Sequence, residues 1–516
     1  MANQPIPMNG LMTAMPRETR GRILSGMRWT LWLSGLAVPF GFGTSLILAR
    51  TSPEAIGTYG LLSVYLSVVT SLFYLGGDTV VIKFVPMLDG ESRLSFLLSY
   101  FSVICLAFVG WMTFAFVWPE KLHYLFGTHA NSGFSLWILL AAPVYIAFSI
   151  IAATLKGMLE MRWAQILLRL ITIGSFLTYA TFFTFLRGIL AAHYEILIWS
   201  VYLGLVGIGA VVGGRHLIRS NRWNRVRRLR FFLPRGFWRY MLATQQLSVL
   251  SFLSGRLDYI LILNFGGLGT LGKYVAVSTV GSVIPVVNSL FVDTVMPSLT
   301  NLVATENSEG AAEVVALYLR ILFAVTAAVT CCLMLSANIL TMLFGPKYAG
   351  LQVPVVVLVL FFGLSAPGGA GGLLLSAVGK QQAAVWVTLG QVVSFVGLFY
   401  LLWPRFQLVG AILAYGSAEL IFYFLQLLIA QRLVPIRFTF GREYGSFALV
   451  ALAAAALAAW TKLGVAAALL GWVVAMAGFL LLAGYSLREC IALTKCFIPN
   501  SALAVWTERK EQYARQ

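Results

Sequence analysis

Charged residues are scarce in this sequence. Only 10% of its 516 residues are Asp, Glu, Lys or Arg, whereas soluble domains contain about 25%. Hydrophobic residues make up 59% of the chain, and the mean hydropathy is +0.87. Apolar runs of about 20 residues recur between residues 29 and 487, and each is long enough to cross ~30 Å of hydrocarbon. The composition therefore excludes a soluble domain and predicts an all-α protein that crosses the membrane many times.

Cysteine and histidine are also rare, with five and four residues respectively. Cys105, Cys331 and Cys332 lie within apolar runs, as small hydrophobic residues do, and no spacing predicts a metal site or a structural disulfide. The sequence has no His-Glu cluster, no phosphate-binding Walker loop and no nucleophile elbow. We therefore expect no enzymatic activity, no cofactor and no metal. Any driving force must be a substrate gradient, ion coupling or the membrane potential.

Acidic residues are half as numerous as basic ones, 18 against 36, which gives a formal net charge of +18. We expect about 14 membrane-spanning helices between residues 28 and 487. With the N-terminus inside, 27 of the 36 Lys and Arg fall in interior segments and seven in outer ones. This bias follows the positive-inside rule and predicts that both termini are cytoplasmic. The positive charge therefore follows topology and does not indicate a nucleic-acid partner.

A repeat relates the two halves of the chain. When residues 46–80 are shifted by 215 positions without a gap, they fall on residues 261–295, and 12 of the 35 positions are identical. The identical pairs include Gly57 with Gly272, Asp78 with Asp293, and Thr79 with Thr294. Apolar composition alone does not readily place a scarce Asp and a Gly in the same register. The repeat predicts two copies of one membrane lobe, with a path for substrate between them.

The repeat and the expected spans together divide the chain into six segments. Two lobes of six helices each should be related by a pseudo-twofold axis along the membrane normal, because an even number of spans preserves orientation. The last two helices have no counterpart in the repeat. The segments are a cytoplasmic leader (1–27), the first lobe (28–214), a basic cytoplasmic linker (215–239), the second lobe (240–430), two additional helices (431–487) and a cytoplasmic tail (488–516).

Ionisable side chains within the expected spans are few, and each is costly in hydrocarbon unless it faces a cavity or a partner. Arg256 and Asp258 lie in the span 240–264 and, being two residues apart, point about 200° apart on a helix. That span is too polar to face lipid, so we expect it to line a central cleft. A purely structural ion pair is the alternative for Arg256. The candidate substrate-cavity residues are Arg256, Asp258, Arg169, Glu419 and Gln245.

The repeat-related residues Asp78 and Asp293 lie toward the inner ends of two corresponding spans. Each is expected to act either as an interhelical anchor or cap, or as part of a gate at the inner face. For a gate, we expect an ion pair with Lys83, Arg28 or an arginine of the linker.

Proline and glycine mark the places where helices can bend. Glycine also lets helices pack closely, so hinge and packing roles both stay open. The candidate hinge residues are Pro39, Gly41, Pro367 and Gly368.

The linker 215–239 contains nine arginines within 25 residues, with aromatic residues interleaved among them. A basic residue near an anionic membrane surface contributes about 1 kcal/mol. We therefore expect the linker to lie on anionic phospholipid, either as a segment that sets topology or as a loading site for a phosphate-bearing lipid. The arginines assigned to headgroup recruitment are Arg222, Arg225, Arg227, Arg228 and Arg230.

Several short motifs resemble the polysaccharide-export flippases of bacterial inner membranes. They are RLDYILI at 256–262, LGKY at 271–274, LFGPKY at 343–348 and AVGK at 377–380. The resemblance extends over nearly the whole chain. It is specific for the superfamily that also includes the multidrug and toxin extruders and the lipid II flippase, and less so for a substrate.

This resemblance implies a V-shaped, two-lobed bundle in the bacterial inner membrane. Such a protein moves an undecaprenyl-diphosphate-linked oligosaccharide from the cytoplasmic to the periplasmic leaflet by alternating access. The resemblance also implies a cationic central cavity, in which Arg256 occupies a position of the family motif; Arg28, Lys83 and Arg169 match no motif. The expected partners are the lipid-linked oligosaccharide, anionic phospholipid and a polysaccharide polymerase or co-polymerase.

Two other functions stay open. One is a cation-coupled multidrug extruder of the same superfamily, in which Asp258 and Glu419 would supply the acidic groups. The other is a non-transporting scaffold of a polysaccharide assembly complex, although an inert scaffold has little reason to keep Arg and Asp deep in a span.

Overall fold

The structure is a computed structural model. It describes residues 17–88, 90–117, 132–158, 160–220, 230–286, 308–378, 380–434 and 440–485, together with Asn288 and Leu299. Within these ranges the regular structure is helical, with no strand, so the expected all-α fold is confirmed. The helices are α2 (Arg17–Thr51), α3 (Pro53–Phe73), α4 (Gly77–Phe84), η1 (Val85–Met87), α5 (Gly90–Val117), α7 (Ser132–Gly157), α8 (Met161–Phe185), α9 (Arg187–Ala192), α10 (Tyr194–Ser220), α11 (Phe237–Gly281), α13 (Ser308–Leu335), α14 (Ala337–Phe344), η3 (Pro346–Tyr348), α15 (Gln352–Ser365), η4 (Ala366–Gly368), α16 (Gly369–Ala377), α17 (Gln381–Leu433), α18 (Gly441–Trp460) and α19 (Val465–Ala483).

Ten stretches of helix in the described part of the chain are long and apolar enough to cross a membrane. Two of the longest helices, α11 and α17, each consist of two helices joined across a kink. The kinks lie at Gly267, with φ 75°, and at Gln407, with φ 46°. The polytopic membrane fold is therefore confirmed, and the number of 14 spans stays a prediction.

The chain forms two compact units. Unit 1 comprises Met1–Val283, Leu340–Leu358 and Lys380–Phe422, and unit 2 comprises Ile284–Ile339, Val359–Gly379 and Tyr423–Gln516. The whole of α11 belongs to unit 1, where it packs along α3. The units therefore divide the chain differently from the lobes 28–214 and 240–430, whose boundaries stay a prediction.

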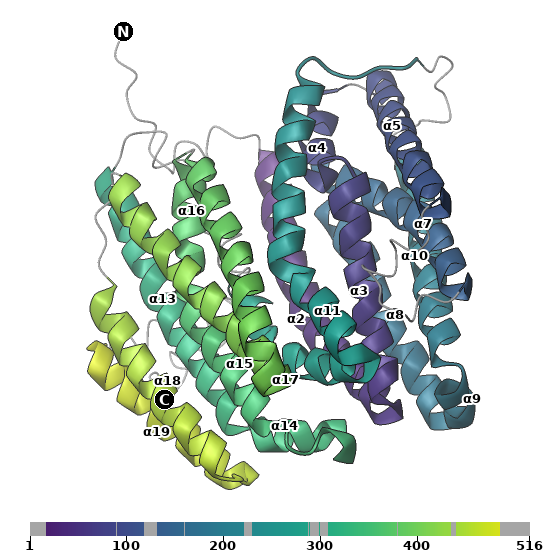
Figure 1. Ribbon diagram of the computed structural model, residues 1–516. Coiled ribbons are helices and arrows are strands. Elements are labelled where there is room, and N and C mark those ends of the chain that lie inside the picture. Colours follow the sequence, from purple (N-terminus) through teal and green to yellow (C-terminus); the bar gives the residue numbers. More distant parts are fainter. Residues whose placement is uncertain are drawn as a thin grey trace, which may run out of the picture. The chain divides into compact units, whose positions relative to one another are not determined.

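In unit 1, α3 and α11 lie side by side (Figure 1) and cross at glycines that the repeat relates. A Cβ atom on Gly57 would lie 2.5 Å from the carbonyl oxygen of Leu268, and one on Gly272 would overlap the carbonyl oxygen of Pro53. Pro53 and Leu268 are themselves related by the 215-residue shift. The two contacts are therefore equivalent, as in a symmetric dimer interface.

In unit 2, the expected hinge at Pro367 and Gly368 lies in the short 3₁₀ helix η4, which separates α15 from α16. Both residues are buried. A Cβ on Gly368 would lie 2.5 Å from the Cβ of Tyr423, so this glycine serves close packing. In unit 1, Pro39 and Gly41 lie within α2, whose helix continues through them. A hinge role for these four residues stays a prediction.

The crossing of α3 and α11 generates a first prediction. Gly272→Ala should lower the free energy of unfolding by about 1–3 kcal/mol, because the added methyl group meets a backbone carbonyl that cannot rotate away. Thermal unfolding in detergent measures the change. The matched control is Gly204→Ala on α10, where nothing lies within 4 Å of the added atom; its midpoint should stay equal or rise slightly. Equal midpoints for the two variants would show that the crossing is loosely packed.

Candidate functional site

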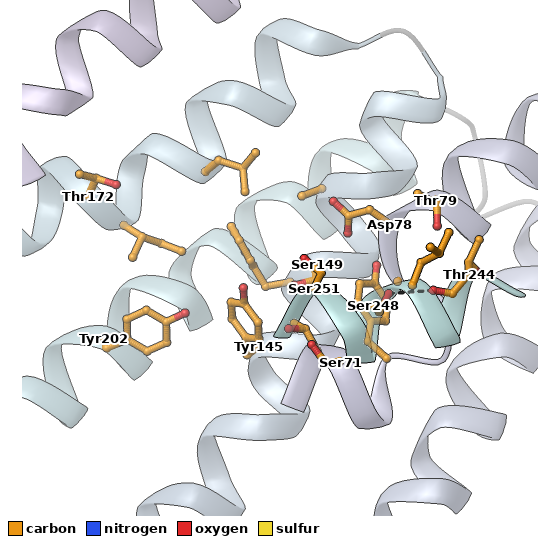
Figure 2. A pocket seen from close by; sticks show the side chains of 18 residues that line it. Ser71, Asp78, Thr79, Tyr145, Ser149, Thr172, Tyr202, Thr244, Ser248 and Ser251 are labelled. Atoms are coloured by element: carbon orange, nitrogen blue, oxygen red, sulfur yellow. Dashed lines mark hydrogen bonds between the residues drawn. The ribbon is translucent and has the colours of Figure 1, made fainter. Parts of the chain in front are cut away.

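Unit 1 contains an open cavity of about 610 Å³, within the range of ligand-binding pockets. Helices α3, α4, α7, α8, α10 and α11 line it. Figure 2 shows Tyr202 and Thr172 toward one end, Thr79 and Thr244 toward the other, and Tyr145 between them. Eleven of the 18 lining residues carry a hydroxyl group. The lining is therefore rich in hydroxyl groups, although apolar side chains also contribute to it.

The cavity lies where α3 ends and α4 begins. The chain between these helices passes through positive φ angles at Leu75 (36°), Gly76 (87°) and Gly77 (62°). Two of these residues are glycines, which adopt such angles at little cost. The break directs Tyr74, Gly77 and the first turn of α4 into the cavity lining.

The peptide groups exposed by the break are bound by side chains from other helices. The side-chain oxygen of Gln245 on α11 accepts a hydrogen bond from the Gly76 N–H at 2.8 Å, and its nitrogen donates to the carbonyl oxygens of Ser71 and Leu72. The hydroxyl of Tyr100 on α5 donates to the carbonyl oxygen of Tyr74 at 2.7 Å. Gln245 therefore holds the end of α3 by hydrogen bonds and is not among the lining residues.

Asp78 is the one charged side chain among the described residues that line the cavity. It lies in the first turn of α4, where a carboxylate is favoured by the helix dipole. Its Oδ2 atom lies 3.0 Å from Nζ of Lys156 on α7. This partner differs from the expected ones: Lys83 instead lies 3.5 Å from the centre of the Tyr240 ring. The ion pair joins α4 to α7, as the anchor alternative requires, and a gating role for Asp78 and Lys83 stays a prediction.

Two expected cavity residues lie further along α11 in a separate cluster of tyrosines. Asp258 is buried and accepts a hydrogen bond from the Tyr274 hydroxyl. The guanidinium carbon of Arg256 lies 5.1 Å from the centre of the Tyr259 ring, and this ring packs edge-on against Tyr274. Neither Arg256 nor Asp258 lines the cavity, so their role toward substrate stays a prediction.

The remaining expected site residues are dispersed. Arg169 follows the lining residue Leu168 on α8, and Glu419 is buried on α17; neither is among the cavity-lining residues. Arg230 is exposed, and its backbone N–H lies 3.4 Å from the hydroxyl of Ser95. The backbone of Arg28 is helical within α2, and its side chain lies outside the described part. Asp293, Arg222, Arg225, Arg227 and Arg228 also lie outside the described residues.

The sequence did not predict most of the residues of the site, among them Lys156, Tyr145, Thr172 and Tyr202. Lys156 carries one signal, since it is a basic residue near the end of an apolar helix. The other three are polar residues on apolar helices with no distinguishing spacing. Only the packing of α7, α8 and α10 brings them to one cavity.

Comparison with known proteins identifies the fold. No protein-family model and no curated protein sequence matches this chain. Solved structures do match: the lipid II flippase MurJ in an inward closed conformation has a TM-score of 0.67 and 14% identity, over 90% of this chain and 99% of that one. A multidrug resistance MATE family transporter of the MOP superfamily, in an inward-facing conformation, has a TM-score of 0.57 and 14% identity, over 79% of this chain and 97% of that one.

A third structure is a MOP superfamily transporter from Pyrococcus furiosus, with a TM-score of 0.56 and 13% identity over 84% of this chain and 98% of that one. At these identities the likeness concerns the fold. The chain thus has the fold of MurJ and of the MATE transporters.

Proposed function

We propose that this protein is a flippase, which moves an undecaprenyl-diphosphate-linked oligosaccharide from the cytoplasmic to the periplasmic leaflet by alternating access. The observation that carries the proposal is the hydroxyl-lined cavity in unit 1. Four of the helices that line it, α3, α8, α10 and α11, are long and apolar enough to cross a membrane. Polar groups among such helices are expensive and usually mark a substrate path. The fold shared with MurJ, a lipid II flippase, supports the proposal.

The helix surfaces also suit a chain that works in lipid. Large apolar side chains are exposed on the C-terminal helices of unit 2, including Trp460 (91%) and Leu481 (78%). Such exposure is unfavourable in water and natural in hydrocarbon. We place the protein in the bacterial inner membrane with both termini cytoplasmic, because of the distribution of Lys and Arg along the chain.

The cavity does not favour a multidrug extruder. A site for cationic drugs needs a carboxylate that is free to pair with the drug, whereas Asp78 already pairs with Lys156. A passive scaffold is also disfavoured, because it would gain nothing from a hydroxyl-lined cavity among its helices.

The basic linker is proposed to recruit the anionic lipid substrate and phospholipid headgroups. The part of it that the structure describes supports this role, because Arg230, Arg235 and Arg239 are exposed. Exposed aromatic residues lie between them, with Phe231 and Trp238 70% and 53% exposed, and such residues favour the membrane interface. A polysaccharide polymerase or co-polymerase is proposed as a further partner.

The proposal is tested by translocation in proteoliposomes. Labelled undecaprenyl-diphosphate oligosaccharide, extracted from the source organism, should cross the bilayer only when the protein is present. Applying a pH gradient or a membrane potential shows the driving force, since charge movement is worth about 2.3 kcal/mol per 100 mV. A well-folded protein that moves none of this lipid, under any gradient, would exclude the flippase function.

A second prediction concerns Arg256. Arg256→Ala should reduce translocation at least tenfold, because the proposed anionic substrate needs a cation on its path and Arg256 is a cation within the membrane-spanning helix α11. The cation–π interaction with Tyr259 contributes about 0.5–2 kcal/mol to stability, so the amount of folded protein in the membrane is measured alongside. The matched control is Arg187→Ala, which removes a similar interaction with Phe183 at 5.2 Å and should transport normally. Normal transport by Arg256→Ala would remove this residue from the substrate path.

A further inference from the structure

Four of the eleven hydroxyl groups that line the cavity have their hydrogen bonded to the backbone. Thr70, Thr79, Thr244 and Ser248 each donate their hydroxyl hydrogen to a backbone carbonyl three or four residues earlier, at 2.6–3.0 Å. A hydroxyl that donates in this way keeps its oxygen lone pairs available. These four residues therefore present acceptor oxygens, and a matching ligand must supply hydrogen-bond donors.

The charge of the lining also favours a ligand that donates hydrogen bonds. Asp78 is an acceptor of hydrogen bonds when ionised, and it is the one charged residue among the described lining. Lys156 neutralises it at 3.0 Å, and Lys83 on the same helix lies against the ring of Tyr240. The ionised diphosphate of the proposed substrate offers hydrogen-bond acceptors only, so it would meet other acceptors and a carboxylate here. A neutral polyhydroxyl ligand avoids both conflicts.

Aromatic side chains complete the lining opposite the hydroxyl groups of α11. Tyr145 and Tyr202 lie with their ring centres 6.2 Å apart, and Phe148 lines the same cavity. A sugar ring has polar edges and apolar faces, and tyrosine offers an apolar ring with a polar tip. Acceptor oxygens together with aromatic rings therefore suit a saccharide.

We propose that this cavity is the saccharide subsite of the transporter, and that the diphosphate of the same lipid binds elsewhere. The inference rests on the proposed function and deepens it. Hydroxyl hydrogens of the sugar donate to the acceptor oxygens of α3, α4 and α11 and to the carboxylate of Asp78, while Tyr145 and Tyr202 contact its apolar faces. Recognition of the sugar and attraction of the anionic carrier thereby take place at separate groups of residues.

Protection from cysteine labelling tests the subsite. Ser251→Cys places a thiol in the cavity lining, on an exposed residue of α11, and Ser254→Cys places a matched thiol one turn further on, outside the lining. Ser248→Cys is a second cavity position if Ser251→Cys fails to fold. Each variant is labelled with a maleimide in proteoliposomes, and labelling of the native cysteines is subtracted with the unsubstituted protein.

Three probes separate the parts of the substrate. They are the undecaprenyl-diphosphate oligosaccharide, undecaprenyl diphosphate without sugar, and the free oligosaccharide released from the first. The oligosaccharide, on its carrier or free, should slow labelling at 251 at least tenfold and leave position 254 unaffected. Undecaprenyl diphosphate should protect neither position.

The contrary outcomes are distinct from one another. Equal protection by undecaprenyl diphosphate would assign the cavity to the phosphates and overturn the inference. The protein could still translocate the lipid while both cavity positions either fail to react with maleimide or react equally fast with and without oligosaccharide. Either result would overturn the subsite and leave the flippase function standing. Absence of both protection and translocation in the unsubstituted protein would overturn the proposed function as well.

The variant Asp78→Asn should change binding in opposite directions for a saccharide site and for a phosphate site. It removes the negative charge from the lining and leaves Lys156 without its carboxylate partner. A saccharide site loses a charge-assisted hydrogen bond. The oligosaccharide concentration that halves the labelling rate of the cysteine at position 251 should therefore rise roughly tenfold. A phosphate site would instead bind undecaprenyl diphosphate more tightly. Tighter binding of the sugar-free lipid would therefore contradict the assignment.

Discussion

The close approach of α3 and α11 at Gly57 and Gly272 is the constraint on which the described site depends. Each glycine faces backbone atoms of the other helix, so the two helices cannot come this close with any larger residue in either place. Packing of small residues is a main source of helix association in lipid, where apolar surface alone drives no association. The same two helices then form the cavity: α3 ends there, and α11 supplies a wall of hydroxyl-bearing residues.

A helix that ends among apolar neighbours exposes peptide groups that need partners. In unit 1 the partners come from α5 and α11, through Tyr100 and Gln245. The hydrogen bonds that stabilise the rim of the cavity are thus also bonds between helices. A displacement of α11 along α3 would break the hydrogen bonds of Gln245 and leave peptide groups at the end of α3 unpaired, which costs about 1–3 kcal/mol for each buried group. The shape of the cavity and the register of these helices therefore change together.

The amino-acid sequence predicts the parts of this architecture that are encoded locally. Long apolar runs predict the spans, and the register of the repeat identifies Gly57, Gly272 and Asp78 before any contact is known. The partner of Asp78 was not predictable, because Lys156 lies 78 positions away and several other cations were equally eligible. Tyr145 and Tyr202 were missed for a similar reason, since tyrosines are common in apolar helices. Arg256 and Asp258 were chosen for their depth in a span, and the structure places them among tyrosines outside the cavity.

The equivalence of the two glycine contacts has a consequence for ancestry. A half-length chain that paired with a second copy of itself through this glycine would make both contacts at once, since each copy offers the other the same glycine and the same helix start. A single mutation in such a chain would damage the interface twice. After duplication and fusion, each glycine is inherited separately, and its replacement damages one contact. Fusion thus lets the two halves diverge as long as each keeps its glycine at the crossing, and 12 of the 35 aligned positions are still identical.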